Sequence, residues 1–165
     1  MPLRKLRESL DQAGVRYTLI RHSPAMTAQE VAASAHIPGK EVAKTVMVLL
    51  NRRMAMAVLP ASYKVDFRRL REASGADEAR LATEAEFGEK FSECELGAIP
   101  PFGNLYGMEV YASESLAEDD EIAFSAGAHT ELIHLAYDDF ERLARPTVIR
   151  FSEPALPAAH GPDIW

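Results

Sequence analysis

The segment Val42-Ala43-Lys44-Thr45-Val46-Met47-Val48-Leu49-Leu50 determines how we interpret the rest of this chain. Its residues are mostly β-branched or long and apolar, a composition that predicts a buried strand. Side chains alternate between the two faces of a strand, so Lys44 shares its face with four apolar residues, Val42, Val46, Val48 and Leu50. An unpaired ammonium is costly in such surroundings. Either the stem of Lys44 snorkels to an edge of the sheet, or this face lines a pocket whose ligand attracts a positive charge.

The flanking segments predict a hairpin within a sheet that is covered by helices. Asn51-Arg52-Arg53 favours a turn, and Met54 to Leu59 reads as the returning strand. Hairpin connections outnumber crossovers along the chain, which favours antiparallel pairing. We therefore expect one α+β domain over residues 1–151, a curved, mostly antiparallel mixed sheet that is barrel-like, with helices packed around it. A Pro-rich C-terminal tail is expected over residues 152–165. Strands are expected at 15–20, 42–50, 54–59, 79–82, 105–112, 122–125, 131–136 and 147–151, and helices at 3–13, 28–35, 67–73, 84–91 and 138–144.

Local signals mark several helix ends. Thr27 with Glu30 and Thr83 with Glu86 have the spacing of a capping box, in which side chain and backbone satisfy each other's hydrogen bonds. The acidic run at residues 114–121 predicts a solvated loop or helix face.

Composition limits the possible classes of protein. The chain has 165 residues, of which 47% are hydrophobic and 26% charged, as in soluble globular proteins. We expect a cytoplasmic protein without membrane association, because no apolar run of about 18 residues and no signal-peptide core is present. The net charge of −7 argues against a large nucleic-acid footprint but leaves room for one basic spot that binds a few nucleotides. A monomer is the default expectation.

Absent motifs exclude several chemistries. The sequence contains no phosphate-binding Gly-Lys-Ser/Thr loop, no dinucleotide glycine fingerprint and no His-Glu-x-x-His, so we expect neither a cofactor nor a metal. Cys94, the single cysteine, fits a small buried residue better than a nucleophile. Three features remain as candidates: Lys44, the loop Gly97-Ala98-Ile99-Pro100-Pro101-Phe102-Gly103, and Gly127-Ala128-His129. Taken singly, each feature favours a structural explanation: the loop is a rigid turn and the last segment a hairpin tip.

The order of these features resembles the YbaK/EbsC family of aminoacyl-tRNA deacylases, also called the prolyl-tRNA-synthetase-associated domain. The matching pieces are Lys44-Thr45-Val46, Gly97-x-x-x-Pro101-Phe102-Gly103, the segment from Phe124 to Glu131, and Tyr137-x-Asp139-Phe140-x-x-Leu143. The helix that begins with Thr27-Ala28-Gln29-Glu30 also fits. The likeness extends to about Phe151.

The resemblance implies a free-standing domain that hydrolyses, in trans, the ester of a mischarged tRNA carrying Ala, Ser, Thr or Cys. Its expected partner is the acceptor end of that tRNA, and an aminoacyl-tRNA synthetase is a second candidate partner. His129-x-Glu131 is more similar to the branch that handles small or hydroxylated residues. A non-catalytic binding module for an aminoacyl or nucleotide end is the alternative. An esterase that acts through Cys94 or His129 is a third.

The residue chemistry is compatible with ester hydrolysis. Backbone N–H groups of Gly97 and Ala98 would stabilise an oxyanion, and Lys44 would bind the carbonyl oxygen or oxygens of the terminal nucleotide. His129 is the candidate proton shuttle, a task that the 2′-hydroxyl of the tRNA could share. Phe102 would either stack on the adenine or lie in the core. The expected substrate-binding residues are Val46 and Val48 as pocket walls, Pro101, Phe102 and Gly103 in the loop, and Gly127.

Overall fold

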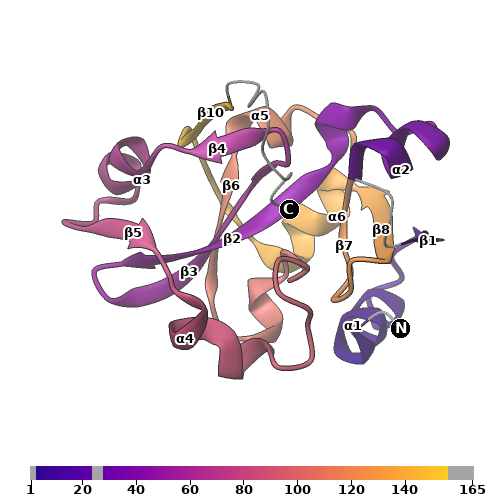
Figure 1. Ribbon diagram of the computed structural model, residues 1–165, viewed down its shortest axis with the longest axis horizontal. Coiled ribbons are helices and arrows are strands. Elements are labelled where there is room, and N and C mark those ends of the chain that lie inside the picture. The colour runs from indigo at the N-terminus through magenta and orange to yellow at the C-terminus, as the bar shows by residue number, and fades with distance from the viewer. Residues whose placement is uncertain (1–2, 24–27, 156–165) are drawn as a thin grey trace.

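The computed structural model describes residues 3–23 and 28–155, which form strands flanked by helices on both sides (Figure 1). The central sheet has the strand order β5-β2-β3-β6-β9. The predicted hairpin is its middle: β2 (Ala43–Leu50) pairs antiparallel with β3 (Arg53–Pro60), and Lys44 lies opposite Leu59. The other strands of this sheet are β5 (Ala79–Leu81), antiparallel to β2, and the parallel strands β6 (Glu109–Ser113) and β9 (Thr147–Ile149).

Two smaller sheets complete the fold. One has the order β1-β8-β7, and the other pairs β10 with β4; both are antiparallel. A single parallel bridge between Val42 and Ala123 joins the central sheet to β7. The mixed, mostly antiparallel α+β domain is confirmed. The sheets of the described residues do not close into a barrel, because this bridge is the one ladder contact between β2 and β7. The strands of these two smaller sheets are β1 (Tyr17–Arg21), β4 (Tyr63–Val65), β7 (Glu121–Ser125), β8 (Glu131–Ala136) and β10 (Ser152–Pro154).

The helices mostly begin and end where the sequence signals predicted. Leu6 and Leu10 of α1 are fully buried, and Asp66 accepts the cap hydrogen bond of α3 from the Arg69 N–H at 3.1 Å. No helix of the described part is long and apolar enough to cross a membrane. The elements are α1 (Arg4–Gln12), α2 (Ala28–Ser34), α3 (Phe67–Ser74), α4 (Glu84–Phe87), α5 (Glu114–Ala117) and α6 (Tyr137–Ala144), with 3-10 turns η1 (Gly39–Glu41), η2 (Gly88–Phe91) and η3 (Gly103–Leu105).

Some local predictions were wrong or fall outside the described residues. The strand expected from Leu105 begins at Glu109, because residues 103–105 form a 3-10 turn instead. The acidic run is only partly solvated: it contains α5, and the Asp119 side chain is buried beside Lys40, with 3.5 Å between Oδ1 and Nζ. Strand β10 occupies the first residues of the expected tail, whose boundary stays a prediction. Thr27, in the first capping box, lies outside the described residues.

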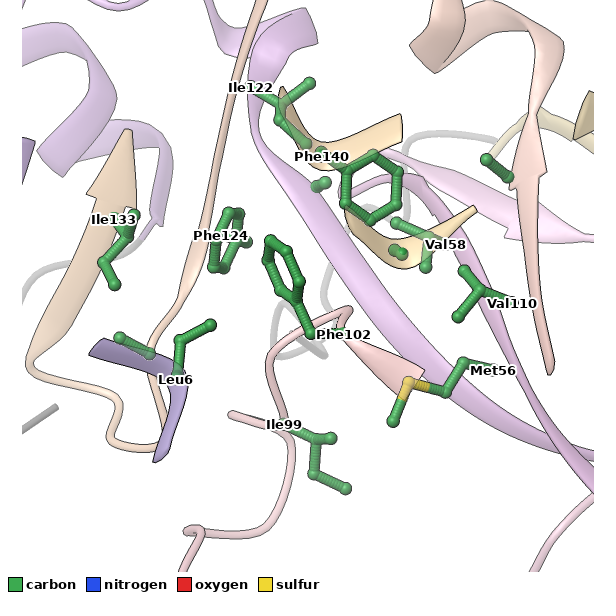
Figure 2. Close-up of a cluster of buried hydrophobic side chains, with 14 of the residues drawn as sticks. Leu6, Met56, Val58, Ile99, Phe102, Val110, Ile122, Phe124, Ile133 and Phe140 are labelled. Carbon is green, nitrogen blue, oxygen red and sulfur yellow. The ribbon is translucent and has the colours of Figure 1, made fainter. Parts of the chain in front are cut away.

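A core of aromatic and aliphatic side chains fills the space between the sheets (Figure 2). Phe102 lies at its centre, with ring centroids 5.4 Å from Phe124 and 5.6 Å from Phe140. Each fully buried side chain of this size contributes roughly 1.5–3 kcal/mol relative to exposure. Ile99 and Leu6 belong to the same core, so the loop of residues 97–103 and α1 are packed against the same side of β2. Val48 and Leu50 point to a second core on the other side, shared with Leu70 and Phe151 of the described chain.

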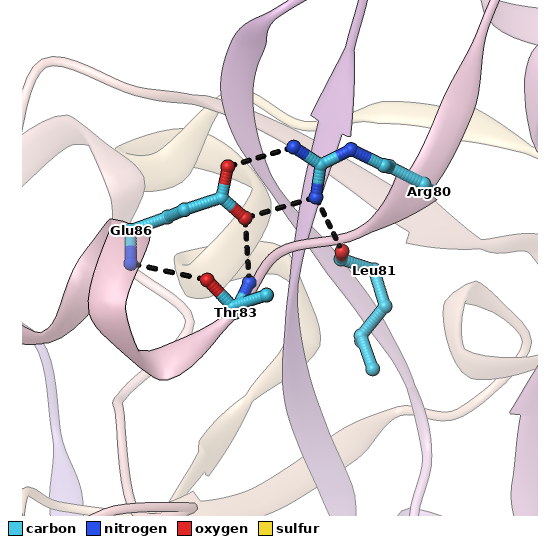
Figure 3. A network of polar contacts seen from close by, with 4 residues as sticks. All are labelled: Arg80, Leu81, Thr83 and Glu86. Carbon is cyan, nitrogen blue, oxygen red and sulfur yellow. Dashed lines mark hydrogen bonds and ion pairs between the residues drawn. The ribbon is translucent and has the colours of Figure 1, made fainter.

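The second capping box anchors the segment that leads to the loop (Figure 3). Glu86 N–H donates to the Thr83 hydroxyl, and the Glu86 carboxylate accepts from the Thr83 N–H at 2.8 Å. Arg80 adds a two-point ion pair to the same carboxylate, at 2.9 and 2.7 Å. These hydrogen bonds, Arg80 foremost, lower the pKa of Glu86 to about 2. Strand β5 is thereby fastened to the start of α4.

Candidate functional site

The loop at Gly97 and the hairpin tip at Gly127 are held together by backbone hydrogen bonds. Glu95 N–H donates to the Gly127 carbonyl at 2.8 Å, and Gly127 N–H donates to the Ala98 carbonyl at 2.9 Å. Both glycines have positive φ, 83° at Gly97 and 98° at Gly127, a backbone conformation that residues with a Cβ atom rarely adopt. The structure therefore brings together Gly97, Ala98, Gly127 and, two residues later, His129, although some thirty residues of chain separate the two segments.

The two predicted oxyanion donors differ in availability. Ala98 N–H donates to the Glu95 carbonyl at 3.0 Å and is therefore already occupied within the loop. We correct its expected role accordingly: Ala98 contributes its carbonyl, which positions Gly127. Gly97 N–H has no acceptor among the residues that the structure describes. Gly97 is thus the loop donor that a substrate oxygen can use without breaking a turn.

His129 is tied to the same loop at two points. Its backbone N–H donates to a Glu95 carboxylate oxygen at 3.4 Å, and its ring Nε2 forms a short hydrogen bond with the Leu96 carbonyl. A carbonyl can only accept, so Nε2 carries the proton, and in the neutral ring the lone pair is on Nδ1. The partly exposed His129 ring therefore offers Nδ1 as a base.

Lys44 lies on the face of β2 that turns toward β7. Val42 and Ala123 form the parallel bridge and share a small apolar cluster with Ala32 and Ile37, which defines one common face of the two strands. Two residues further along that face come Lys44 on β2 and Ser125 on β7, and Gly127 follows after two more. Beyond this bridge β2 and β7 of the described chain form no further ladder pair, so alternation places Lys44 and Ser125 only on the same side of their own strands as Val42 and Ala123.

The environment of Lys44 is unusual for a lysine. The side chain is half-buried, and desolvation lowers the pKa of its ammonium. Within residues 3–23 and 28–155 the ammonium has no ion pair and no hydrogen bond. A desolvated cation without a counter-charge favours an anionic or carbonyl ligand, as the pocket interpretation requires.

Ser125 is the site residue that sequence reasoning did not single out. It is buried, and its hydroxyl has no hydrogen-bond partner within the described chain. Its Oγ is not among the fully enclosed, unpaired polar atoms of the described residues, so water or a ligand can reach this hydroxyl. The sequence signal was a serine on the same face of β7 as Glu121 and Ala123, two residues before Gly127.

Several predicted substrate-binding residues belong to the core instead. Phe102 is 0% exposed and its ring is enclosed by Phe124 and Phe140, so it does not reach an adenine. Val48 is also fully buried, in the second core, and is not a pocket wall. Pro101 is buried as well, and Val46 packs partly against the second core. We therefore assign these residues to the core packing that supports the site.

Gly103 is required for close packing. A Cβ atom there would lie 2.6 Å from the Met108 carbonyl oxygen and 2.7 Å from Val110 Cγ2, well inside van der Waals contact. The Gly103 carbonyl also accepts from the N–H groups of Tyr106 and Met108, both at 2.9 Å. This glycine therefore fixes the end of the loop, and its contact with a substrate stays a prediction.

Other groups near the loop do not form a second reactive centre. Cys94 lies 3.9 Å from the Tyr106 hydroxyl, and burial raises the pKa of its thiol, which makes it a poorer nucleophile at neutral pH. In the described residues no group of three His, Cys, Asp or Glu side chains is arranged to hold a metal ion.

Comparison with known protein families gives a match over most of the chain. The family model for the aminoacyl-tRNA editing domain matches residues 22–143. The matched region contains Lys44, Gly97, Ser125 and His129, the residues from which the site is built.

Two curated proteins are similar in sequence. The multifunctional Ser/Thr-tRNA deacylase ProXp-y of Escherichia coli (strain K12) is 36% identical over 101 residues, which cover 61% of this chain and 60% of that protein. The match thus spans about three-fifths of this relative's length. The prolyl-tRNA editing protein ProX of Acetoanaerobium sticklandii is 24% identical over 142 residues, 82% of this chain and 86% of that protein.

Solved structures share the fold. The hypothetical protein APE2540 superimposes with a TM-score of 0.79 at 22% identity, covering 91% of this chain and all of that chain (100%). A crystal structure assigned provisionally as a trans-editing enzyme for prolyl-tRNA synthetase gives 0.77 at 18% identity, covering 91% and 96%. At these identities the likeness concerns the arrangement of strands and helices.

Proposed function

Because the chain belongs to the aminoacyl-tRNA editing domain family, we propose that it is a trans-editing deacylase that hydrolyses the ester between a small amino acid and the 3′ end of a tRNA. One observation carries the proposal: a desolvated lysine without an ion pair among the described residues lies two positions beyond the bridge from β2 to β7, and β7 leads to Gly127, which is hydrogen-bonded to the loop of Gly97. The mischarged tRNA is the partner, and the protein acts as a monomer in the cytoplasm.

The reaction that we propose is a simple hydrolysis. A water oxygen attacks the ester carbonyl carbon, and the C=O electron pair becomes an oxyanion. Collapse of this intermediate breaks the bond to the ribose oxygen, which takes up the proton lost by the water. The ester of an aminoacyl-tRNA is already activated, so the protein mainly supplies orientation and stabilisation of the oxyanion.

The site residues supply these contributions as follows. Gly97 N–H donates to the oxyanion, and the Lys44 ammonium adds charge stabilisation where desolvation strengthens it. The Ser125 hydroxyl holds the amino group or a ribose hydroxyl of the substrate. His129, through Nδ1, transfers the proton from water to the leaving ribose oxygen, either alone or together with the free hydroxyl of the terminal ribose.

For the amino acid we propose serine and threonine as the first substrates to test. The E. coli relative is described as a Ser/Thr-tRNA deacylase, and the polar groups of Lys44 and Ser125 suit a hydroxyl-bearing side chain. A site that hydrogen-bonds a hydroxyl rejects the analogue without it far more strongly than an apolar pocket rejects one methylene group, which is worth only about 1–3 kcal/mol.

The test is a deacylation screen over Ser-, Thr-, Ala-, Cys- and Pro-tRNA, with Lys44→Met run beside the wild type. Lys64→Met is the matched control, because Lys64 is exposed on β4 and paired with Glu153. We expect hydrolysis of at least one of these substrates, a loss of about 10²-fold or more in Lys44→Met, which keeps the apolar stem, and wild-type rates in the control. Binding of charged tRNA without hydrolysis of any of them would instead identify a non-catalytic module.

A further inference from the structure

The start of α1 lies directly against the candidate site. Leu3 N–H donates to the Ala126 carbonyl at 3.0 Å, and a Cβ on Gly127 would lie 3.5 Å from Leu3 Cβ. Arg4, Lys5 and Arg7 follow at once, so three cations stand within two turns of the helix beside the hairpin tip. Hereafter these three residues are called the α1 cations.

The first turn of α1 contains these cations and no acidic residue. That distribution is the reverse of what the helix dipole favours, since cations are disfavoured near an N-terminus. Local rules of this kind are most often broken where function requires it. The arrangement therefore indicates a surface that serves a negatively charged partner.

The carboxylates of α1 leave most of this charge available. Glu8 pairs with Arg4 at 3.0 Å, but the Arg4 side chain is 92% exposed, and Asp11 accepts a hydrogen bond from the Tyr17 hydroxyl. Lys5 and Arg7 have no carboxylate within ion-pair distance among the described residues, although Tyr17, Asp11 and Glu131 lie near enough to Arg7 to raise the pKa of its guanidinium. The Lys5 ammonium instead lies 3.7 Å above the centre of the Tyr106 ring, a cation–π contact that keeps its charge.

The cation–π contact also connects α1 to the site. The Tyr106 hydroxyl lies 3.9 Å from Cys94 Sγ, and Cys94 in turn would contact a Cβ on Gly127 at 3.9 Å. Lys5 is thus linked through Tyr106 and Cys94 to Gly127, and Leu3 links the start of α1 to the same hairpin tip. A strand of RNA whose 3′ end enters the site would pass its next phosphates along this helix.

Other basic groups are less suitable. On α3, Arg68 pairs with Glu72 at 3.3 Å and Arg69 with Asp66 at 3.5 Å. Figure 1 shows α3 at the opposite end of the molecule from α1. In a chain with a net charge of −7, binding of a polyanion has to be confined to one place, and only the α1 cations among these groups adjoin the site.

We propose that the α1 cations bind the phosphate backbone of the tRNA acceptor end. The inference rests on the proposed function for its choice of polyanion, but the surface can be tested without hydrolysis. Each phosphate neutralised steepens the salt dependence of binding by about 0.7 in single strands to 0.9 in duplexes on a log–log scale.

The experiment measures binding of uncharged, fluorescently labelled tRNA between about 50 and 200 mM salt, the range over which such contacts weaken strongly. The variant Arg4→Gln/Lys5→Gln/Arg7→Gln removes the three charges with residues that favour helices. Arg68→Gln/Arg71→Gln on α3 is the control, and Lys5→Arg tests whether charge alone suffices. Melting temperatures establish that all variants are folded.

We expect the α1 variant to lower the salt slope by about 2, the control to keep the wild-type slope, and Lys5→Arg to behave as the wild type. The ratio of deacylation of full-length tRNA to that of aminoacyl-adenosine, which has no phosphate, should fall at least tenfold. An unchanged slope in the folded α1 variant overturns the proposal. Salt-dependent binding through α1 without hydrolysis of any aminoacyl-tRNA supports the surface and refutes the deacylase function alone.

Discussion

The substitution Gly103→Ala tests whether the loop that positions Gly97 depends on close packing at its far end. The added Cβ would lie 2.6 Å from the Met108 carbonyl oxygen, roughly 0.8 Å short of the 3.4 Å at which ordinary contact begins. The clash is with backbone, which cannot rotate away. Met108 N–H is itself bonded to the Gly103 carbonyl, so moving Met108 also strains the turn.

The expected cost follows from these two effects. Overpacking of this kind costs typically about 1–3 kcal/mol, and a weakened turn hydrogen bond about 1 kcal/mol. We expect the free energy of unfolding to fall by about 2–4 kcal/mol. For a domain of this size the melting temperature should drop roughly 2–4 °C per kcal/mol. Urea unfolding followed by circular dichroism measures the first quantity, and a thermal melt the second.

The matched control is Gly39→Ala. A Cβ at Gly39 meets nothing within 4 Å, and the backbone there is not left-handed. This variant should stay within about 0.5 kcal/mol of the wild type. Wild-type stability in Gly103→Ala would show that the loop gives way easily, and the packing argument for the position of Gly97 would then be refuted.

Three further predictions concern the core and the pH dependence of stability. Phe102→Ala should lower the free energy of unfolding by about 3–5 kcal/mol through the cavity that it leaves, whereas KM measured on the folded fraction should not change. A raised KM would indicate that Phe102 contacts the substrate after all. Desolvation lowers the pKa of Lys44 in the folded state, so its ammonium destabilises the fold at neutral pH, and this destabilisation fades as pH rises through the folded pKa toward 10.5. Lys44→Met should therefore be more stable than the wild type at pH 7, by a difference that becomes smaller in alkali. A stability difference that does not depend on pH would contradict this explanation. The pKa of Glu86 is about 2 in the folded protein against 4.5 in the unfolded chain, so its contribution to the free energy of unfolding is present above pH 4.5 and is lost as pH falls toward 2. Arg80→Gln should reduce this loss of stability in acid, measured by denaturation at a series of pH values. The same loss in both proteins would exclude the ion pair as its cause.

Local patterns determined much of this fold. The apolar, largely β-branched run at residues 42–50 predicted β2, and the strand period of two assigned Lys44 to the face of Val42 and Val46, because both depend only on neighbouring residues. Thr83 and Glu86 likewise gave a helix start that the structure confirms, since a capping box closes within four residues. The order of Lys44, the glycine loop and His129 was sufficient to suggest the family.

What the sequence did not reveal was which residues meet across the chain. The bridge between Val42 and Ala123 brings the start of β2 beside β7, although the two bridged residues lie eighty-one positions apart in sequence. Nothing local distinguishes a pocket phenylalanine from a core phenylalanine, and packing between Phe124 and Phe140 placed Phe102 in the core. Likewise, only the folded loop shows that Ala98 N–H is occupied, whereas Gly97 N–H has no acceptor within residues 3–23 and 28–155. Strand periods and caps are local physics, but pairing between distant strands is decided by which surfaces bury one another, and the tertiary structure alone records that outcome.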